Sequence, residues 1–371
     1  MKLIFSDNTI WGLVNFRQEI FKHFYEKGYE IVLVAPSDAQ TQMKTHLPDY
    51  VKFVPIQLNR SGKNPLADVK YLYSLYKVYR KERPDWIFHY TIKPNIYGTL
   101  AARLLNIPNV AMLAGLGYAF SKGGLANKIA RNLYRFALQF AHKVFVLNTG
   151  NRDVLLRDHI VDSEKVILLE GGEGVNTDTI QEGPSPTQDA DTIFLMVARV
   201  LYDKGYSEFV DAAKILKQKK VKARFVLLGP VDESYPNAVS QQQIDNDVAK
   251  GYIEYLGFSK TPQKIMEKPN TVVVLPSAYH EGLNRSLMEA CALGKPIITT
   301  DIPGCRELVK NGINGYEIPI HNSEKLAQAM DNYLRLSLEE KIKMGHEGRK
   351  WAVERFDVKH VVRVYESIIN K

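Results

Sequence analysis

The sequence predicts an α/β protein with two doubly wound domains, each a parallel sheet covered by helices. Its 371 residues suggest about two domains at ~150 residues each. A content of 45% hydrophobic and 24% charged residues is ordinary for globular proteins, and it excludes disordered and collagen-like chains. Short apolar runs alternate with helical patterns along the whole chain, which is the rhythm of βαβ units.

The front half contains five fully apolar runs, which we expect to be strands buried on both faces of a sheet. They are Leu3–Phe5, Ile31–Val34, Trp86–Phe88, Val110–Leu113 and Val144–Leu147. Helices are expected between them over Phe16–Lys27, which Gly28 closes, and over Leu66–Glu82, which Pro84 stops. The first domain is therefore expected over residues 1–180.

A polar stretch with two prolines and no apolar periodicity, residues 181–192, is the predicted linker. The alternation then restarts, so a second domain is expected over residues 193–357. Its predicted elements are strands at Ile193–Ala198, Phe225–Leu228, Tyr252–Leu256, Val272–Leu275 and Pro296–Thr299, a helix over Gly205–Gln218, and a terminal helix over 358–369. Two such sheets in sequence predict a cleft between them, with ligands beyond the carboxyl ends of strands.

The net charge of +8 is unevenly distributed. Residues 1–152 contain 21 Lys and Arg against 9 Asp and Glu, a net +12, whereas the rest of the chain contains 28 against 32, a net −4. Such asymmetry indicates that the front half faces an anionic partner, namely nucleic acid, a phospholipid surface or a phosphorylated substrate, or else that it is a solvated basic surface.

Cysteine usage and hydropathy indicate a cytoplasmic protein. Cys291 and Cys305 are the two cysteines, too few for a disulfide framework, as expected in a reducing compartment. The N-terminus has three consecutive apolar residues before Ser6 and Asp7, so it lacks the apolar core of a signal peptide. Nowhere does an uninterrupted apolar run reach the ~18 residues of a membrane span.

The segment Pro276–Ala290 gives the strongest chemical signal, because it places two carboxylates across a strand-to-helix junction. Glu281 follows the predicted strand, and Glu289 lies within a helix expected over Leu283–Leu293. Backbone amides at Leu283 and Asn284, at the positive end of that helix, suit a phosphate, and Gly282 permits close backbone approach. The alternative is two ordinary surface glutamates.

Arg199 and Lys204 supply cations at the same predicted edge. Arg199 ends the strand Ile193–Ala198, and Lys204 opens the next helix, so both can neutralise a diphosphate leaving group. They could instead form a solvated cap. We find no Asp-x-Asp after an apolar strand and no His/Cys cluster, so no metal site and no cofactor are expected.

These segments, together with Gly294–Glu307, resemble the retaining GT-B glycosyltransferases called glycosyltransferase group 1. The front segments His89–Gly98 and Ala114–Phe120 are typical of bacterial members that extend lipid-linked oligosaccharides. The resemblance implies two Rossmann-like domains facing a cleft, and a terminal helix over residues 358–371 that crosses back to the first domain. It also implies a UDP-sugar donor, with a hexosamine as the favoured sugar, and a polyprenyl-diphosphate-linked acceptor.

Roles for individual residues follow from the same resemblance. Glu281 would contact the donor sugar hydroxyls and Glu289 the ribose, while Arg199 and Lys204 would bind the diphosphate. Backbone groups near Gly257 and Phe258 would hold the base.

The acceptor side departs from the family pattern. A His in a Thr-x-His-Gly-like segment, common in the family, is replaced here by Ala114-Gly-Leu-Gly117. The glycine-rich N-terminal turn of the family is likewise replaced by residues 7–17. The candidates for acceptor contacts are Asn15, Arg17, His89, Lys93 and Gly117, and a lone His such as His89 is as often structural as it is a base.

An amphipathic basic helix is expected over residues 123–143. Lys128, Arg131 and Arg135 recur at helical spacing, beside an apolar stripe of Leu133, Phe136, Ala137 and Phe140. Basic charge with nearby aromatics is typical of a helix on an anionic bilayer, although the stripe could simply face the core. We therefore expect a peripheral protein on the inner face of the cytoplasmic membrane.

Two rival functions stay open. Nucleic-acid binding by the basic half is disfavoured, because the sequence has no RNP-like strand, zinc finger or recognisable helix-turn-helix. A nucleotide-sugar epimerase or hydrolase of the same fold would consume its donor without an acceptor. We expect a glycosyltransferase whose diphosphate leaving group takes up the acceptor proton on the same face of the sugar.

Overall fold

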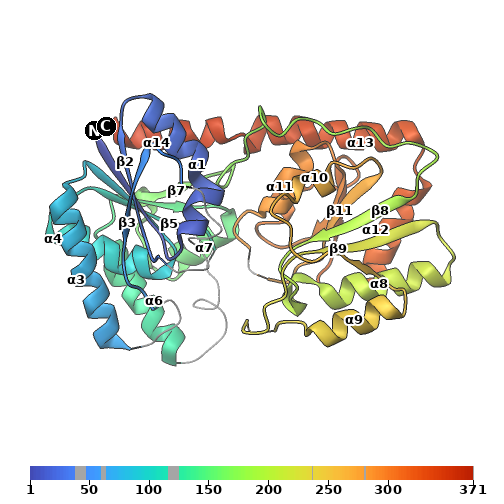
Figure 1. Cartoon of the computed structure of the whole chain (residues 1–371), viewed down its shortest axis with the longest axis horizontal. Helices are drawn as coiled ribbons and strands as arrows, with labels where there is room; N and C mark the ends of the chain where they lie inside the picture. The colour runs from blue at the N-terminus through green and yellow to red at the C-terminus, as the bar shows by residue number, and fades with distance from the viewer. Residues whose placement is uncertain (38–46, 60–63, 116–124, 236, 280, 371) are drawn as a thin grey trace. The chain divides into compact units, whose positions relative to one another are not determined.

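The computed structural model describes residues 1–37, 47–59, 64–115, 125–235, 237–279 and 281–370. The chain forms two compact units. Unit 1 comprises Met1–Glu173 and Val358–Lys371, and unit 2 comprises Gly174–Asp357. Each unit contains one sheet with helices on both faces (Figure 1).

Unit 1 contains a seven-stranded, all-parallel sheet in the order β3-β2-β1-β4-β5-β6-β7. Its strands are β1 Lys2–Ser6, β2 Glu30–Ala35, β3 Val51–Pro55, β4 Trp86–Tyr90, β5 Asn109–Leu113, β6 Lys143–Val146 and β7 Val166–Leu168. Its helices are α1 Ile10–Glu26, α3 Pro65–Glu82, η1 Pro94–Gly98, α4 Thr99–Leu104, α6 Leu125–Leu138, α7 Thr149–Arg157, η2 Ser163–Lys165 and α14 Val358–Ile369.

Alternation of side chains along the strands builds two cores in unit 1. On one face, Phe5 and Phe88 stack and contact Phe21 of α1 and Tyr365 of α14. On the other face, the residues on either side of them in sequence pack with the buried side of α3. The terminal helix α14 thus belongs to unit 1, where its Tyr365 hydroxyl lies 2.9 Å from that of Tyr90.

Unit 2 contains a six-stranded, all-parallel sheet in the order β10-β9-β8-β11-β12-β13. Its strands are β8 Thr192–Val197, β9 Ala223–Leu228, β10 Glu254–Tyr255, β11 Thr271–Leu275, β12 Ile297–Thr300 and β13 Gly315–Ile318. Its helices are η3 Tyr202–Lys204, α8 Tyr206–Gln218, α9 Gln241–Ala249, α10 Gln263–Met266, α11 Arg285–Ala292, η4 Arg306–Leu308, α12 Ser323–Arg335, α13 Leu338–Trp351 and η5 Ala352–Phe356.

The expected linker is bound to unit 2. Asn270 donates to the carbonyl oxygens of Thr187 and Ala190, and the Lys295 ammonium donates to that of Pro184 at 2.8 Å. These bonds hold the linker against unit 2. Unit 2 itself begins before the linker, at Gly174, whereas we expected the first domain to reach residue 180.

All five apolar runs of the front half form strands, as predicted. The strands that the sequence did not reveal, β3, β7 and β13, lie at sheet edges, where partial exposure removes the continuous apolar signature. The predicted strand Tyr252–Leu256 is reduced to the two residues of β10, also at an edge. The expected helix over Gly205–Gln218 begins one residue later, at Tyr206.

Candidate active site

Two candidate residues meet at the carboxyl end of the unit 2 sheet. Strands β8 and β11 are hydrogen-bonded neighbours, so the chain segments that follow them lie close together. Lys204 ends the short helix η3 after β8, and its ammonium donates to Oε1 of Glu281, which follows β11. Both side chains are less than a tenth exposed, and the Ser277 hydroxyl donates to the same carboxylate oxygen at 3.1 Å.

Two tyrosines contact the candidate cations. The Lys204 ammonium lies 4.6 Å from the centre of the Tyr279 ring, and the Arg199 guanidinium lies 4.3 Å from that of Tyr235. Burial raises the pKa of the Tyr279 phenol, and the nearby positive charge of Arg199 opposes that rise. The charged groups of Arg199, Lys204 and Glu281 therefore all lie around Tyr279. The sequence predicted that the two cations would lie at the same edge of the sheet.

Glu289 forms a separate ion pair. Its Oε1 accepts a hydrogen bond of 2.8 Å from Nε of Arg285, one helical turn earlier in α11. The Arg285 Nη1 donates to the carbonyl oxygen of Gly174 at 2.6 Å. The two carboxylates singled out in the sequence are thus both buried and both paired, which excludes the alternative of ordinary surface glutamates.

The predicted start of this helix at Leu283 is wrong by two residues, because α11 begins at Arg285. The Asn284 amide donates to the carbonyl oxygen of Gly304 at 3.0 Å, and the Asn284 side chain caps the helix by accepting from the Leu287 amide at 3.2 Å. The first-turn amides of α11 therefore begin at Arg285. The Asn284 amide is used within the fold, and the side chain of Leu283 is buried.

Glycines allow the loops of this site to pack closely. A Cβ on Gly304 would lie 2.0 Å from the carbonyl oxygen of Gly282, and a Cβ on Gly205 would lie 2.2 Å from that of Pro276. Both glycines also have positive φ angles of 91° and 89°. Any side chain there would push the loops apart or strain the backbone, so these glycines set the position of Glu281 and Lys204.

Gly257 and Phe258, expected near the base, follow β10, the edge strand beyond β9 and β8. The Gly257 carbonyl oxygen accepts from the Gly229 amide at 2.9 Å, and the Phe258 side chain is 55% exposed. An exposed aromatic face at the carboxyl end of a strand can stack on a planar base. The role of these two residues stays a prediction.

Two protein-family models match the chain. Residues 178–351 match the model for glycosyl transferases group 1, and residues 2–148 match the model for glycosyl transferase 4-like proteins. Both models describe glycosyltransferases, so the chain is a glycosyltransferase in which residues 178–351 form a group 1 domain.

Curated relatives match this glycosyltransferase over more than two thirds of their own length. It is 28% identical over 359 residues to the N,N'-diacetylbacillosaminyl-diphospho-undecaprenol alpha-1,3-N-acetylgalactosaminyltransferase of Campylobacter jejuni, covering 91% of this chain and 92% of that protein. It is 26% identical over 275 residues to the UDP-Gal:alpha-D-GlcNAc-diphosphoundecaprenol alpha-1,3-galactosyltransferase of Escherichia coli, covering 71% and 70%.

The expected GT-B fold is confirmed by solved structures. Anabaena HepE in complex with UDP aligns over 100% of both chains with a TM-score of 0.78 and 19% identity. A glycosyltransferase from Rickettsia africae aligns over 99% of this chain and 97% of its own, with a TM-score of 0.79 and 19% identity.

Two acceptor-side candidates of the glycosyltransferase are buried within unit 1, where they contact other residues of that unit. His89 is fully buried within β4, its Nε2 lies 3.1 Å from the Tyr79 hydroxyl, and burial lowers the pKa of its imidazole to about 3. His89 is therefore a neutral core residue, and its candidacy as an acceptor contact is wrong. Arg17 is buried too, bonded to Asp7 at 3.0 Å and to Glu173.

The other candidates of unit 1 differ in exposure. The Lys93 ammonium donates to Asp68 at 2.6 Å, so this lysine is part of an ion pair, and its role toward an acceptor stays a prediction. Asn15 is exposed on α1, where its side chain donates to the Trp11 carbonyl oxygen at 2.9 Å. Gly117 lies outside the described residues.

The basic helix α6 is present, and its predicted apolar stripe is buried only in part. Phe136, expected in the core-facing stripe, is 54% exposed, as is Ile129 at 51%. The buried face is formed by Tyr134, Leu138 and the predicted Ala137, and the predicted Leu133 packs against the same core.

The cations of α6 do two different things. The Arg135 guanidinium donates to the carbonyl oxygens of Asp158 and His159, and Arg131 pairs with the Asp158 carboxylate at 3.6 Å. These two arginines therefore attach α6 to the end of α7. Lys128 is exposed on the same helix.

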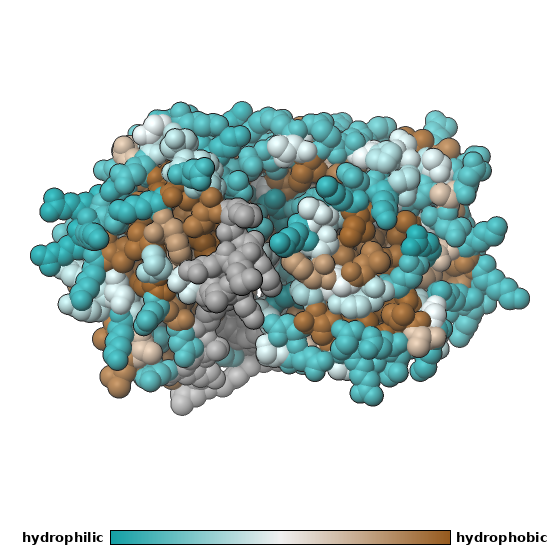
Figure 2. All heavy atoms as spheres, viewed as in Figure 1, coloured by the Kyte–Doolittle hydropathy of each residue, from teal (hydrophilic) through white to brown (hydrophobic). Residues whose placement is uncertain are grey.

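Hydrophobic residues also reach the surface elsewhere in unit 1. Leu66, Val69 and Tyr73 are all more than half exposed near the start of α3. Figure 2 shows hydrophobic residues in brown, and some of them reach the surface at the lower left of that view. No helix of the described part of the chain is long and apolar enough to cross a membrane.

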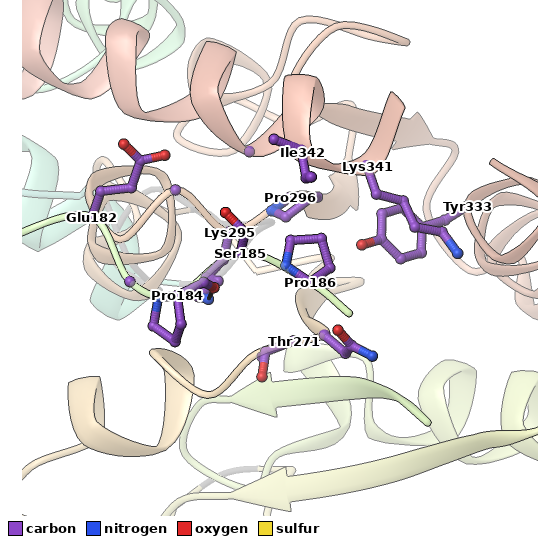
Figure 3. A pocket seen from close by; sticks show the side chains of 14 residues that line it. Glu182, Pro184, Ser185, Pro186, Thr271, Lys295, Pro296, Tyr333, Lys341 and Ile342 are labelled. Atoms are coloured by element: carbon purple, nitrogen blue, oxygen red, sulfur yellow. Dashed lines mark hydrogen bonds between the residues drawn. The ribbon is translucent and has the colours of Figure 1, made fainter. Parts of the chain in front are cut away.

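A separate pocket lies at the opposite, amino-terminal edge of the unit 2 sheet (Figure 3). Lys295 and Pro296 line it just before β12, with Thr271 at the start of β11 and Lys341 on α13. Burial lowers the pKa of the Lys295 amine to about 8. The pocket contains none of the predicted donor residues, and its space is about that of one water molecule.

Sequence reasoning missed three residues of the site: Arg285, Tyr279 and Tyr235. Arg285 could have been found, because it precedes Glu289 by four residues on a predicted helix. The two tyrosines lie in loops, where no periodicity indicates which cation they will contact. Within the described residues, no three His, Cys, Asp or Glu side chains gather as a metal site requires.

Proposed function

We propose that this glycosyltransferase transfers an N-acetylhexosamine from a UDP-sugar to a saccharide carried on polyprenyl diphosphate, with retention of anomeric configuration. The observation that carries the proposal is the buried Lys204–Glu281 pair, which shares the surroundings of Tyr279 with Arg199. The printed activities of the Campylobacter jejuni and Escherichia coli relatives supply the donor and acceptor classes.

The donor diphosphate is assigned to the two cations. A lysine ammonium has three donors, of which Glu281 takes one, so protons are left for phosphate oxygens. The Arg199 guanidinium can give two parallel hydrogen bonds to a phosphate. Because Tyr279 and Tyr235 contact the two cations before the donor arrives, less side-chain freedom is lost on binding.

Glu281 has a second role toward the sugar. Its Oε1 accepts from both Lys204 and Ser277, which fixes the orientation of the carboxylate. A carboxylate has about four acceptor sites, so one held in this way can also accept a hydrogen bond from a donor-sugar hydroxyl. One carboxylate thereby sets the distance between the sugar and the cation that binds its leaving group.

The chemical step needs no base from the protein. The bond between the anomeric carbon and the UDP oxygen breaks, and the departing β-phosphate oxygen takes the proton of the acceptor hydroxyl. That hydroxyl oxygen bonds the anomeric carbon from the same face, which gives the lengthened saccharide and UDP. The tasks of Arg199 and Lys204 are to position the diphosphate and stabilise its charge, so we propose that no divalent metal is required.

The acceptor is assigned to unit 1 and the membrane surface. The net +12 over residues 1–152 favours a lipid diphosphate and anionic headgroups. On α6, the exposed Ile129 and Phe136 stand near the exposed Lys128, a combination suited to the boundary between headgroups and acyl chains. We propose a peripheral location on the inner face of the cytoplasmic membrane.

A donor screen tests this function. Purified enzyme is incubated with UDP-, GDP- or ADP-sugars and an undecaprenyl-diphosphate glycan, with EDTA present, and products are identified by mass. The expected result is one added N-acetylhexosamine, from UDP-GalNAc or UDP-GlcNAc, and almost no donor loss without acceptor. Donor consumption without acceptor would favour an epimerase or hydrolase instead.

A further inference from the structure

The side chain of Arg285 makes two hydrogen bonds that are not part of the backbone hydrogen bonding of its helix. Its Nε donates to Glu289 at 2.8 Å and its Nη1 donates to the Gly174 carbonyl oxygen at 2.6 Å, with the side chain 29% exposed. A planar guanidinium can hold both acceptors at once in a fixed geometry, which a lysine ammonium cannot do as well. Glu289 is thereby connected to the first residue of unit 2.

Helix stability does not explain this arginine. Arg285 is the first residue of α11, where the positive end of the helix dipole disfavours a cation. Its order relative to Glu289, cation first and carboxylate four residues later, is also the weaker of the two orders for such pairs. An arginine that is unfavourable for its own helix must be compensated by what it contacts.

Glu289 supplies that compensation. Its side chain is only 6% exposed, and a buried carboxylate without a hydrogen-bonded cation is costly. Arg285 takes Oε1, so the carboxylate is held in one orientation while Oε2 stays outside this bond.

The Gly174 end of the bridge is itself fixed. Gly174 has a φ of 74°, and the next amide, that of Val175, donates to the Phe356 carbonyl oxygen at 2.8 Å. Asp357 pairs with Val175 in an isolated bridge and accepts a hydrogen bond from Thr177. The guanidinium therefore donates to a carbonyl group in a backbone segment that is itself held in place by hydrogen bonds.

We infer that Arg285 is a positioning residue that orients Glu289 for the ribose of the nucleotide by bracing it against Gly174. The inference rests on the proposed function, in which Glu289 contacts that ribose. Arg285 acts on donor binding through Glu289 and does not contact the reacting atoms.

Donor affinity tests the inference. Arg285→Ala should raise the KM for the UDP-sugar and the Kd for UDP about tenfold, the value of a charge-assisted hydrogen bond, with kcat changed less than about twofold. Arg285→Lys should give intermediate values, because it keeps the charge but not the two-point geometry. Arg335→Ala is the matched control, since Arg335 pairs with Asp331 at the same spacing on α12 but is 76% exposed.

A double-mutant cycle separates positioning from simple loss of charge. In a Glu289→Ala background, Arg285→Ala should change the UDP Kd less than about twofold, because the group it orients is gone. An undiminished effect in that background would overturn the inference, as would an unchanged Kd in the single variant. If Arg285→Ala does not fold, the same cycle is run with Arg285→Lys. Failure of the wild-type enzyme to bind UDP would instead contradict the proposed function.

Discussion

The Lys204 ammonium and the Glu281 carboxylate form an ion pair at the carboxyl end of the unit 2 sheet, with both side chains less than a tenth exposed. Burying two charges costs more free energy than their attraction commonly returns. A protein that needed only stability could place apolar residues there. We therefore propose that this pair is kept for chemistry, which agrees with its place after β8 and β11.

Removing one member of the pair should affect stability and activity differently from removing both. Lys204→Met leaves the Glu281 charge buried and should cost about 3–5 kcal/mol of unfolding free energy. Lys204→Met/Glu281→Gln should recover most of that stability, yet turnover should stay about 10²-fold or more below wild type. Chemical unfolding and initial rates on the same preparations measure both. Recovery of activity in the double variant would show that the pair is structural.

The ring of Tyr279 should matter more than its hydroxyl. Tyr279→Phe keeps the aromatic face under the Lys204 ammonium, so kcat/KM should change less than about twofold. Tyr279→Leu removes it and should lower kcat/KM about fivefold, a typical value for a cation–π contact. Tyr73→Leu is the matched control, because the Lys77 ammonium lies 4.4 Å from the Tyr73 ring and neither residue is among the proposed donor residues. Equal losses in the Phe and Leu variants would point to the hydroxyl instead.

His89 should affect the pH dependence of stability and not that of catalysis. Its folded pKa of about 3 lies below the ordinary value of 6.5, so the unfolded state takes up a proton first as the pH falls. Wild type should thus lose about 2 kcal/mol from this residue between pH 7 and pH 5, and His89→Gln should lack that loss. Urea unfolding at the two pH values measures the difference. A shifted pH–rate profile in the variant would restore His89 as a catalytic candidate.

The exposed apolar residues of α6 should contribute to membrane binding. Ile129→Ser/Phe136→Ser should weaken binding to vesicles that contain anionic phospholipid by about tenfold or more, because two apolar side chains no longer leave water. Sedimentation with the vesicles measures the bound fraction. Val248→Ser, an exposed position on α9 of unit 2, should bind as wild type does. Unchanged binding of the double variant would exclude α6 as the lipid contact.

Sequence reasoning predicted the two sheets and the donor-side charges because both depend on local patterns. Apolar runs revealed the central strands, and Glu281, Glu289, Arg199 and Lys204 each follow a strand or lie in the next helix. Partners from distant segments had no such signal: the bond between Arg285 and Gly174 joins residues 111 positions apart.

Two predictions for unit 1 failed for a related reason. Whether a side chain is buried depends on which faces of its strand or helix are covered by other elements, and the sequence does not show this directly. His89 lies in a strand with both faces covered, so its imidazole packs against Tyr79. Phe136 was placed in one stripe with Leu133 and Ala137, which do contact the core, but the Phe136 side chain itself is exposed.

The anomeric configuration of the new linkage tests the central claim most directly. Product made from α-linked UDP-GalNAc or UDP-GlcNAc and a polyprenyl-diphosphate saccharide is isolated, and the coupling of its new anomeric proton is measured by NMR. The account predicts an α linkage, formed while the UDP held by Arg199 and Lys204 takes the acceptor proton. A β linkage would contradict it, because inversion requires a base on the opposite face of the sugar.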